Sequence, residues 1–153
     1  MGAKSAIRPA TILYDEDFVA WTAETARLLR AGRFNQVDIA HLAEEIEDRG
    51  KSDQRELESR LTVLILHLLK WQFQPEKRSG RWQSTIIAQR AEVLKLLEQS
   101  PSMRRRLPKS VGEIYSTAVR QAAAETGFPV NAFPRECSCS VEQILDQDFL
   151  PGR

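Results

Sequence analysis

Apolar side chains recur every three or four residues along most of the chain, which is the spacing of one face of an α-helix. The first such face is made of Phe18, Trp21, Thr25, Leu28 and Leu29. We expect this helix to begin near Asp15, because a helix N-terminus stabilises the three carboxylates of the sequence YDEDF. Arg30 followed by Gly32 predicts where the helix ends.

A second apolar face begins after Asp38, a residue type that favours the N-cap position. The face keeps its helical phase over positions 39, 43, 46, 50, 53, 57, 61, 64 and 68. A loop would usually reset this phase, so the pattern favours one helix from about residue 38 to about residue 74, ended by Pro75. Gly50 and Asp53 are not apolar, which leaves open the alternative of a hairpin that turns at Gly50.

Two more helices are predicted in the second half of the chain. The third covers about residues 81–99, and its inward face consists of Trp82, Ile86, Val93, Leu94 and Leu97. Ser100 as N-cap and Pro101 at the first helical position begin the fourth. Its inward face consists of Met103, Leu107, Val111, Ile114, Ala118 and Ala122. Pro108 predicts a kink or a short break in this helix, and Gly127 predicts its end.

The C-terminal part, FPVNAFPRECSC followed by SVEQIL, is irregular before a short last helix, for which Ser140 and Gln143 have the capping-box spacing. No segment alternates apolar and polar residues over a full strand length. The sequence therefore predicts an all-α fold: an antiparallel helical bundle around one long central helix, with an irregular C-terminal segment. We expect one helical domain over residues 14–153 and a disordered or extended tail over residues 1–13.

Charge, cysteine content and motifs exclude several classes of protein. The chain has 22 basic and 21 acidic residues, a net charge of +1, whereas dedicated DNA-binding domains are usually more basic. No apolar run approaches the roughly 20 residues that cross a bilayer, and the N-terminus lacks the apolar core of a signal peptide. We expect Cys137 and Cys139 to be reduced thiols, as in a cytoplasmic protein. No catalytic motif and no cofactor motif is present, so neither is predicted.

A polar strip follows the side of the long helix opposite its leucines, when residues are placed about 100° apart. It contains Glu56, Arg60, His67, Lys70 and Gln74, and it reaches Glu45 and Arg49 when extended backward. One interpretation is a partly solvated face with pairs such as Glu56 with Arg60. The other is a polar groove in which a histidine titrates near neutral pH. For this groove the candidate site consists of Glu44, Glu45, Asp48, His67, Lys70 and Trp71.

The sequence HLAEE has the residue types of a metal site, because His41 stands three and four residues before Glu44 and Glu45. Carboxylate-bridged metal sites in bundles use two Glu-x-x-His motifs on paired helices. The chain has only two histidines, and on one continuous helix His41 and His67 would lie too far apart to share an ion. We therefore predict no metal site.

The turn after the long helix is a candidate anion-binding site. It contains Lys77, Arg78 and Arg81, close in sequence to Trp71 and Trp82. Cations together with aromatic rings can hold phosphates and stack bases. The alternative is that the tryptophans anchor helix ends in the core while the cations solvate the loop.

The chain resembles a bacterial domain-of-unknown-function family, number twenty-nine, from about Tyr14 to Pro151. The most specific matching pieces are LAEEIEDRG, RELESRL, HLLKWQFQP and QILDQDFLP. The resemblance implies an all-helical, cytoplasmic protein and brings no assigned activity. The positions that match the family motif are Glu44, Glu45, Glu47, Asp48, His67, Lys70, Trp71, Trp82, Gln89 and Arg90.

Three functions from different classes follow. The first is a small non-catalytic interaction or regulatory module that binds a protein partner or a second copy of itself; a large exposed apolar patch would favour it. The second is an enzyme or small-ligand binder with a polar pocket around His67. The third is a phosphate or nucleic-acid binder that uses the basic turn from Lys70 to Arg81, which the balanced charge disfavours.

Overall fold

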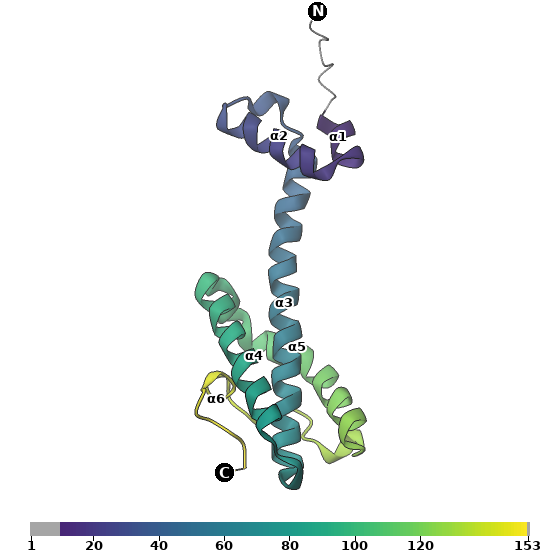
Figure 1. Ribbon diagram of the computed structural model, residues 1–153, viewed down its shortest axis with the longest axis vertical. Helices are drawn as coiled ribbons and strands as arrows, with labels where there is room; N and C mark the ends of the chain where they lie inside the picture. The colour runs from purple at the N-terminus through teal and green to yellow at the C-terminus, as the bar shows by residue number, and fades with distance from the viewer. Residues whose placement is uncertain (1–9, 153) are drawn as a thin grey trace, which may run out of the picture. The chain divides into compact units, whose positions relative to one another are not determined.

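The computed structural model describes residues 10–152, and their side chains from Leu13 onward (Figure 1). The described residues form six α-helices, three short 3-10 helices and no strand. This confirms the predicted all-α class. The α-helices are α1 (Ala10–Glu16), α2 (Phe18–Arg30), α3 (Ile39–Phe73), α4 (Gly80–Gln99), α5 (Pro101–Thr126) and α6 (Val141–Leu145). The 3-10 helices are η1 (Phe34–Gln36), η2 (Pro75–Lys77) and η3 (Val130–Ala132).

The chain divides into two compact units, residues 1–51 and residues 52–153, and the boundary falls within α3. Helix α3 is nevertheless uninterrupted over its 35 residues. The prediction of one long helix is confirmed, and the alternative hairpin at Gly50 is wrong. The predicted single domain over residues 14–153 stays a prediction. Of the predicted tail, residues 1–9 lie outside the described part of the chain, and residues 10–13 belong to α1.

In the first unit, the sequence around Asp17 makes two helices where one was predicted. The Asp17 side chain accepts a hydrogen bond from the backbone N–H of Ala20 at 3.0 Å, so Asp17 caps α2 and separates it from α1. The predicted start near Asp15 is therefore wrong. The predicted end is confirmed: α2 stops at Arg30, and Gly32 has a φ of 71°, which suits glycine.

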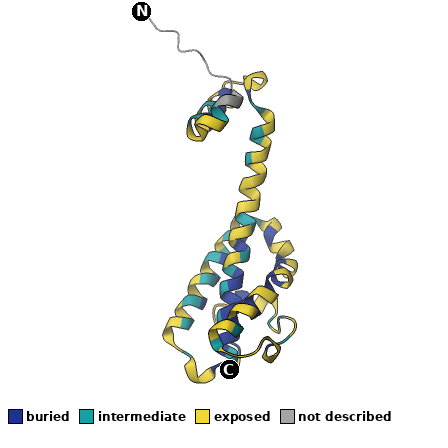
Figure 2. Cartoon of the chain, turned by 90° about the vertical axis from the view of Figure 1, so that its right-hand side faces the viewer, coloured by how far each residue is buried: buried dark blue, intermediate teal, exposed yellow. Residues whose placement is uncertain are grey.

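In the second unit, the later half of α3 is covered on nearly all sides. From Leu57 to Trp71 ten of its residues are buried, among them six leucines and Ile65. Figure 2 shows this change from exposed to buried residues along the helix. The covering side chains include Ile86, Leu107 and Ile144, which come from three different helices and are completely buried. All six predicted inward residues of α5 are buried as well.

The predicted helix signals of the second half are confirmed, with one exception. Helix α5 continues through Pro108, so the predicted short break is wrong, and the alternative of a kink stays a prediction. Arg104 and Pro108 are both exposed, so water can satisfy the backbone carbonyl that loses its helical partner. Gly127 ends α5 with a φ of 76°, and the capping box of Ser140 with Gln143 begins α6.

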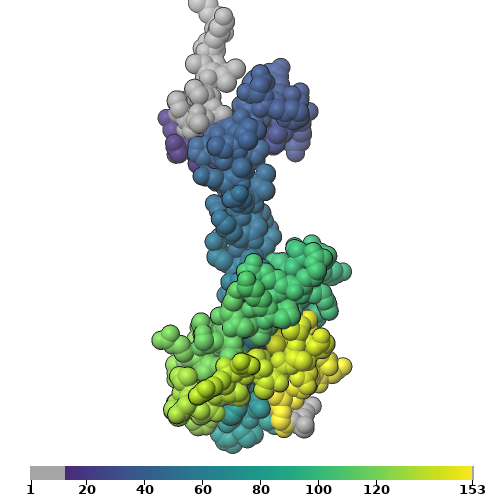
Figure 3. All heavy atoms as spheres, turned by 180° about the vertical axis from the view of Figure 1, so that it is seen from behind, coloured from purple at the N-terminus to yellow at the C-terminus, as the bar shows by residue number. Residues whose placement is uncertain are grey.

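A completely buried arginine of α4 holds the C-terminal segment in place. Figure 3 shows this segment, in yellow, against α4. Arg90 has no exposed surface, and its Nε donates to the carbonyl of Ile144 at 2.8 Å. A second guanidinium nitrogen donates to the carbonyl of Gln143 at 3.1 Å. These carbonyls lie at the end of α6, where backbone acceptors lack helical partners. Burial lowers the pKa of Arg90.

Replacing Arg90 by methionine tests this attachment. Arg90→Met keeps much of the side-chain volume but leaves the carbonyls of Ile144 and Gln143 without their donor, which costs about 1–2 kcal/mol each. We expect the free energy of unfolding, measured by urea denaturation, to fall by about 2–4 kcal/mol. The matched control Arg55→Met changes an exposed arginine of α3 and should cost less than about 0.5 kcal/mol. Equal losses in both variants would contradict the proposed attachment.

Candidate functional site

The first unit contains a cluster of aromatic and acidic side chains, which we call the Tyr14 cluster: Tyr14, Trp21, Asp38, His41 and Glu45. The ring of Tyr14 stacks on His41, with centroids 3.8 Å apart and planes 17° apart. Trp21 meets the same tyrosine ring edge-on at 4.9 Å. These contacts join α1, α2 and the first turns of α3 into one packed unit.

Hydrogen bonds fix the polar groups of the Tyr14 cluster. The Tyr14 hydroxyl donates to Glu45 Oε1 at 2.6 Å. His41 Nδ1 lies 2.5 Å from Asp38 Oδ2, while the other oxygen of Asp38 accepts from the His41 backbone N–H at 3.3 Å. Asp38 therefore caps α3, as its sequence position predicted, and also orients the imidazole of His41.

These contacts change the titration of the groups involved. The hydrogen bond to Glu45 raises the pKa of Tyr14 to about 12. The hydrogen bond to Asp38 raises the pKa of His41 above its ordinary value, and the same bond lowers the pKa of Asp38. Tyr14 and Glu45 are thus engaged with each other, as are Asp38 and His41, whereas the buried indole N–H of Trp21 has no hydrogen-bond partner among the described residues. Among the described residues, no group of three His, Cys, Asp or Glu side chains is arranged to hold a metal ion.

The six predicted residues of the polar site fall into both units. Glu44, Glu45 and Asp48 belong to the first unit, where Glu45 joins the Tyr14 cluster and the other two are exposed. His67, Lys70 and Trp71 belong to the second unit. Each group of three is therefore described within its own unit. The pocket predicted around His67 stays a prediction.

In the second unit, several side chains of the predicted polar strip form hydrogen bonds or ion pairs within the unit. His67 is half-buried, and its Nδ1 lies 2.8 Å from the backbone carbonyl of Val63. Glu56 and Arg60 form the predicted pair at 3.0 Å. A hollow of about 320 Å³ lies along this part of the strip, and it is lined by Glu56, Ser59, Arg60, Val63 and Gln89.

Lys70 is buried, with 8 % of its surface exposed, and has two partners distant in sequence. Its Nζ lies 2.6 Å from Glu125 Oε2 and 4.5 Å from the centroid of the Trp82 ring. The sequence showed no sign of Glu125, because the pairing depends on the end of α5 meeting the end of α3. Lys70 therefore joins three helices of the second unit.

The basic turn divides into one packed arginine and two exposed cations. Arg78 Nε donates to the carbonyl of Trp71 at 2.8 Å, and its guanidinium lies 5.2 Å from the centroid of the Trp71 ring. Lys77 and Arg81 are exposed. Of the three predicted anion-binding residues, Arg78 thus packs against the end of α3, and Lys77 and Arg81 face solvent.

The cysteines are both free thiols, as predicted. The thiols of Cys137 and Cys139 are hydrogen-bonded to each other, which lowers the pKa of Cys137 to about 7 and raises the pKa of Cys139. Burial opposes the change at Cys137 and adds to the change at Cys139. Both residues are half-buried and pack against the core of the second unit.

Large apolar side chains are exposed mainly in the first unit. They are Phe18, Val19, Leu29, Phe34, Ile39 and Ile46, with exposed fractions from 37 % to 76 %. Ile39 and Ile46 were predicted as part of an apolar face, and this part of the face lies open: the two are 60 % and 65 % exposed. Ala43 between them is also exposed. We call these three residues the α3 seam.

Comparison with known proteins gives a family and no activity. A family model described as "Domain of unknown function DUF29" matches residues 13–150. No curated protein and no solved structure matches the chain. Within the described residues, no helix has the length and apolar character needed to cross a membrane.

The bond between His41 and Asp38 makes the stability of the first unit depend on pH. A raised histidine pKa stabilises the fold fully below the unfolded value of 6.5, and this contribution is lost as the pH rises through the folded value. A lowered aspartate pKa stabilises the fold above 3.8 and is lost as the pH falls. The pair therefore stabilises the unit most between these two values.

An NMR titration of the His41 ring measures this effect. We expect its pKa to lie above 6.5 in the wild type and to fall in Asp38→Asn, which keeps a capping side chain but removes the charge. The control Asp148→Asn, an exposed residue of the second unit, should leave the titration unchanged. A His41 pKa that is the same in wild type and Asp38→Asn would show that the bond does not form in solution.

Proposed function

The chain belongs to the DUF29 family, and from this premise we propose that it is a non-catalytic interaction module whose first unit binds a basic, amphipathic helix of a protein partner. The observation that carries the proposal is the exposure of six large apolar side chains in this small unit. Exposed apolar side chains that adjoin one another are typical of protein interaction sites, and Ile39, Ala43 and Ile46 share one side of α3 by their spacing.

The α3 seam has the geometry that suits a partner helix. Ile39 and Ile46 are seven residues apart, which is about two helical turns, and Ala43 lies between them at spacings of four and three. Residues at these spacings project from one side of a helix and form the narrow apolar stripe by which two helices pair. The small side chain of Ala43 would let a partner helix approach closely.

Charge favours a basic partner over a second copy of the chain. From residue 13 to residue 51 the sequence has nine acidic and five basic residues. Glu47, which is exposed, directly follows Ile46 at the edge of the α3 seam. Two copies of this unit would bring like charges together, whereas a basic helix would gain complementary contacts. The same negative charge disfavours nucleic acid and anionic membrane surfaces.

We include a bacterial, cytoplasmic location in the proposal. The resemblance to a bacterial family supports the first part. The two free thiols of Cys137 and Cys139 support the second, because such thiols persist in a reducing compartment.

A synthetic helical peptide of leucine and lysine tests the proposal by fluorescence anisotropy with the full chain. We expect Ile39→Ser combined with Ile46→Ser to weaken binding about tenfold, because the peptide then loses apolar contact with two isoleucines. The matched control Ile87→Ser changes an isoleucine of α4 that is 48 % exposed and should leave the affinity unchanged. A peptide with glutamate in place of lysine should bind at least about tenfold more weakly.

Two results would contradict the proposal. One is an equal loss of affinity in Ile87→Ser, which would mean that the peptide binds exposed apolar side chains without regard to the unit. The other is a stable dimer, seen by analytical ultracentrifugation, that Ile46→Ser dissociates, since the α3 seam would then be occupied by a second copy.

A further inference from the structure

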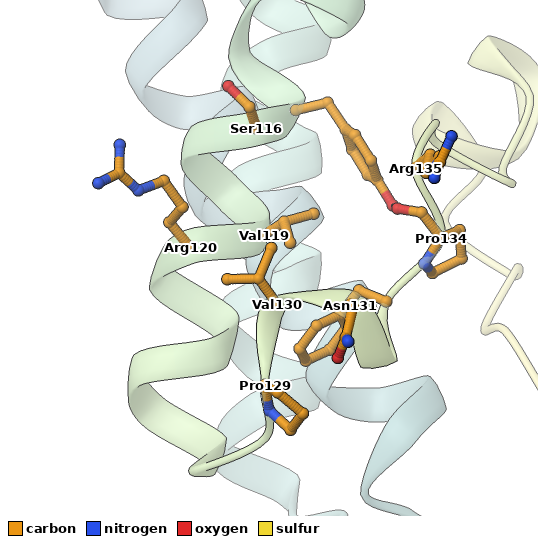
Figure 4. A pocket seen from close by; sticks show the side chains of 10 residues that line it. Ser116, Val119, Arg120, Pro129, Val130, Asn131, Pro134 and Arg135 are labelled. Carbon is orange, nitrogen blue, oxygen red and sulfur yellow. The ribbon is translucent and has the colours of Figure 1, made fainter.

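The second unit contains a pocket of about 760 Å³ between the later turns of α5 and the segment of residues 129–135 (Figure 4). Small-molecule sites in proteins enclose roughly 300–1,000 Å³ and are mostly apolar, with a few polar groups. The buried part of the pocket wall is mostly apolar. It consists of Tyr115, Val119 and Phe133, each of which is only 5 % exposed. Pro129, Val130 and Pro134 continue the apolar lining.

The walls of this pocket are held in place by contacts within the unit. The Tyr115 hydroxyl donates to the carbonyl of Pro134 at 2.8 Å, so the phenol is already engaged. The ring of Phe133 packs edge-on against Phe73 at 5.1 Å. The lining segment also has a proline at its first position, Pro129, and another next to its last position, Pro134, and both restrict its backbone. The pocket therefore needs no ligand to form.

Two free cations stand at the edges of this apolar pocket. Arg120 of α5 and Arg135 lie on opposite sides of it in Figure 4. Both are exposed, and neither guanidinium forms a hydrogen bond or ion pair with any residue that the structure describes. Ser116 and Asn131 add neutral hydrogen-bonding groups, and no acidic side chain lines the pocket.

We propose that this pocket binds an organic anion with an apolar body, of which an aromatic carboxylate is the simplest example. The apolar body covers Val119, Val130 and Phe133, and the carboxylate pairs with a guanidinium, whose fork of N–H groups matches two carboxylate oxygens. An inorganic anion would leave the apolar lining wet. A neutral apolar molecule would leave both cations unused. This site lies in the second unit and selects the opposite charge from the α3 seam, so it is independent of the proposed partner helix.

Titration of the ¹⁵N-labelled full chain with 1-naphthylacetate tests this site by NMR. We expect saturable shifts at Ser116, Val130 and Asn131. The neutral 1-naphthylacetamide, which lacks the charge, and acetate, which lacks the apolar body, should each bind at least about fivefold more weakly.

Arginine variants separate the role of charge from that of folding. Arg120→Gln combined with Arg135→Gln should weaken the binding of naphthylacetate about fivefold and leave that of naphthylacetamide unchanged. Both residues are exposed, so the spectrum should remain that of the folded chain. The matched control is Arg104→Gln combined with Arg105→Gln, two exposed arginines that line a different pocket, and it should bind naphthylacetate like the wild type.

Three outcomes would overturn the proposal. Equal affinity for the acid and the amide would remove the role of the guanidiniums. Acetate or inorganic phosphate binding as tightly as naphthylacetate would indicate a simple anion site with no apolar recognition. Shifts that map outside the pocket, or an equal loss in the control variant, would place the binding elsewhere.

Discussion

The burial of one apolar run, Leu57 to Trp71 in α3, is the constraint on which the second unit depends. A helix with apolar residues on nearly every side cannot be covered by a single neighbour, because one packed helix hides only one stripe. Helices α4 and α5 cover two sides, and the C-terminal segment has to cover a third. That segment is too short and irregular to hold itself in place. Arg90 supplies the missing attachment through two backbone carbonyls.

The same constraint explains the two packed cations at the end of α3, buried Lys70 and half-buried Arg78. Lys70 and Arg78 lie where α3 ends and where the core meets solvent. Each extends an aliphatic stem over apolar surface and places its charge on an aromatic face: Trp82 for Lys70 and Trp71 for Arg78. The match of Lys70, Trp71 and Trp82 to the family motif is thus accounted for by packing, without a ligand.

The sequence predicted the features that depend on residues close together in the chain. Helix ends at Gly32 and Gly127, the capping box at Ser140 and the unbroken length of α3 all follow from local spacing, and all are confirmed. The break at Asp17 was missed because any of the three neighbouring carboxylates could cap a helix. Only the capping hydrogen bond in the structure shows that Asp17 is the residue that separates α1 from α2. The pairing of Lys70 with Glu125 was missed because no local pattern specifies which helix ends meet.

The candidate sites differ from the packed residues in one physical respect that the sequence does not reveal. A cation that binds a ligand must give up whatever it already binds. For Arg90 and Arg78 that means buried backbone carbonyls left without donors, at a cost that cancels much of what a ligand would contribute. Arg120 and Arg135 have no such partner among the described residues, and they border an apolar surface from which a ligand can displace water. By the same reasoning, Ile39 and Ile46 are better candidates for a partner than the buried leucines of the same helix. A ligand or partner therefore binds at least cost where the side chains have no existing hydrogen bond or packing contact to break. In this chain the candidate positions of this kind lie outside the strip around His67.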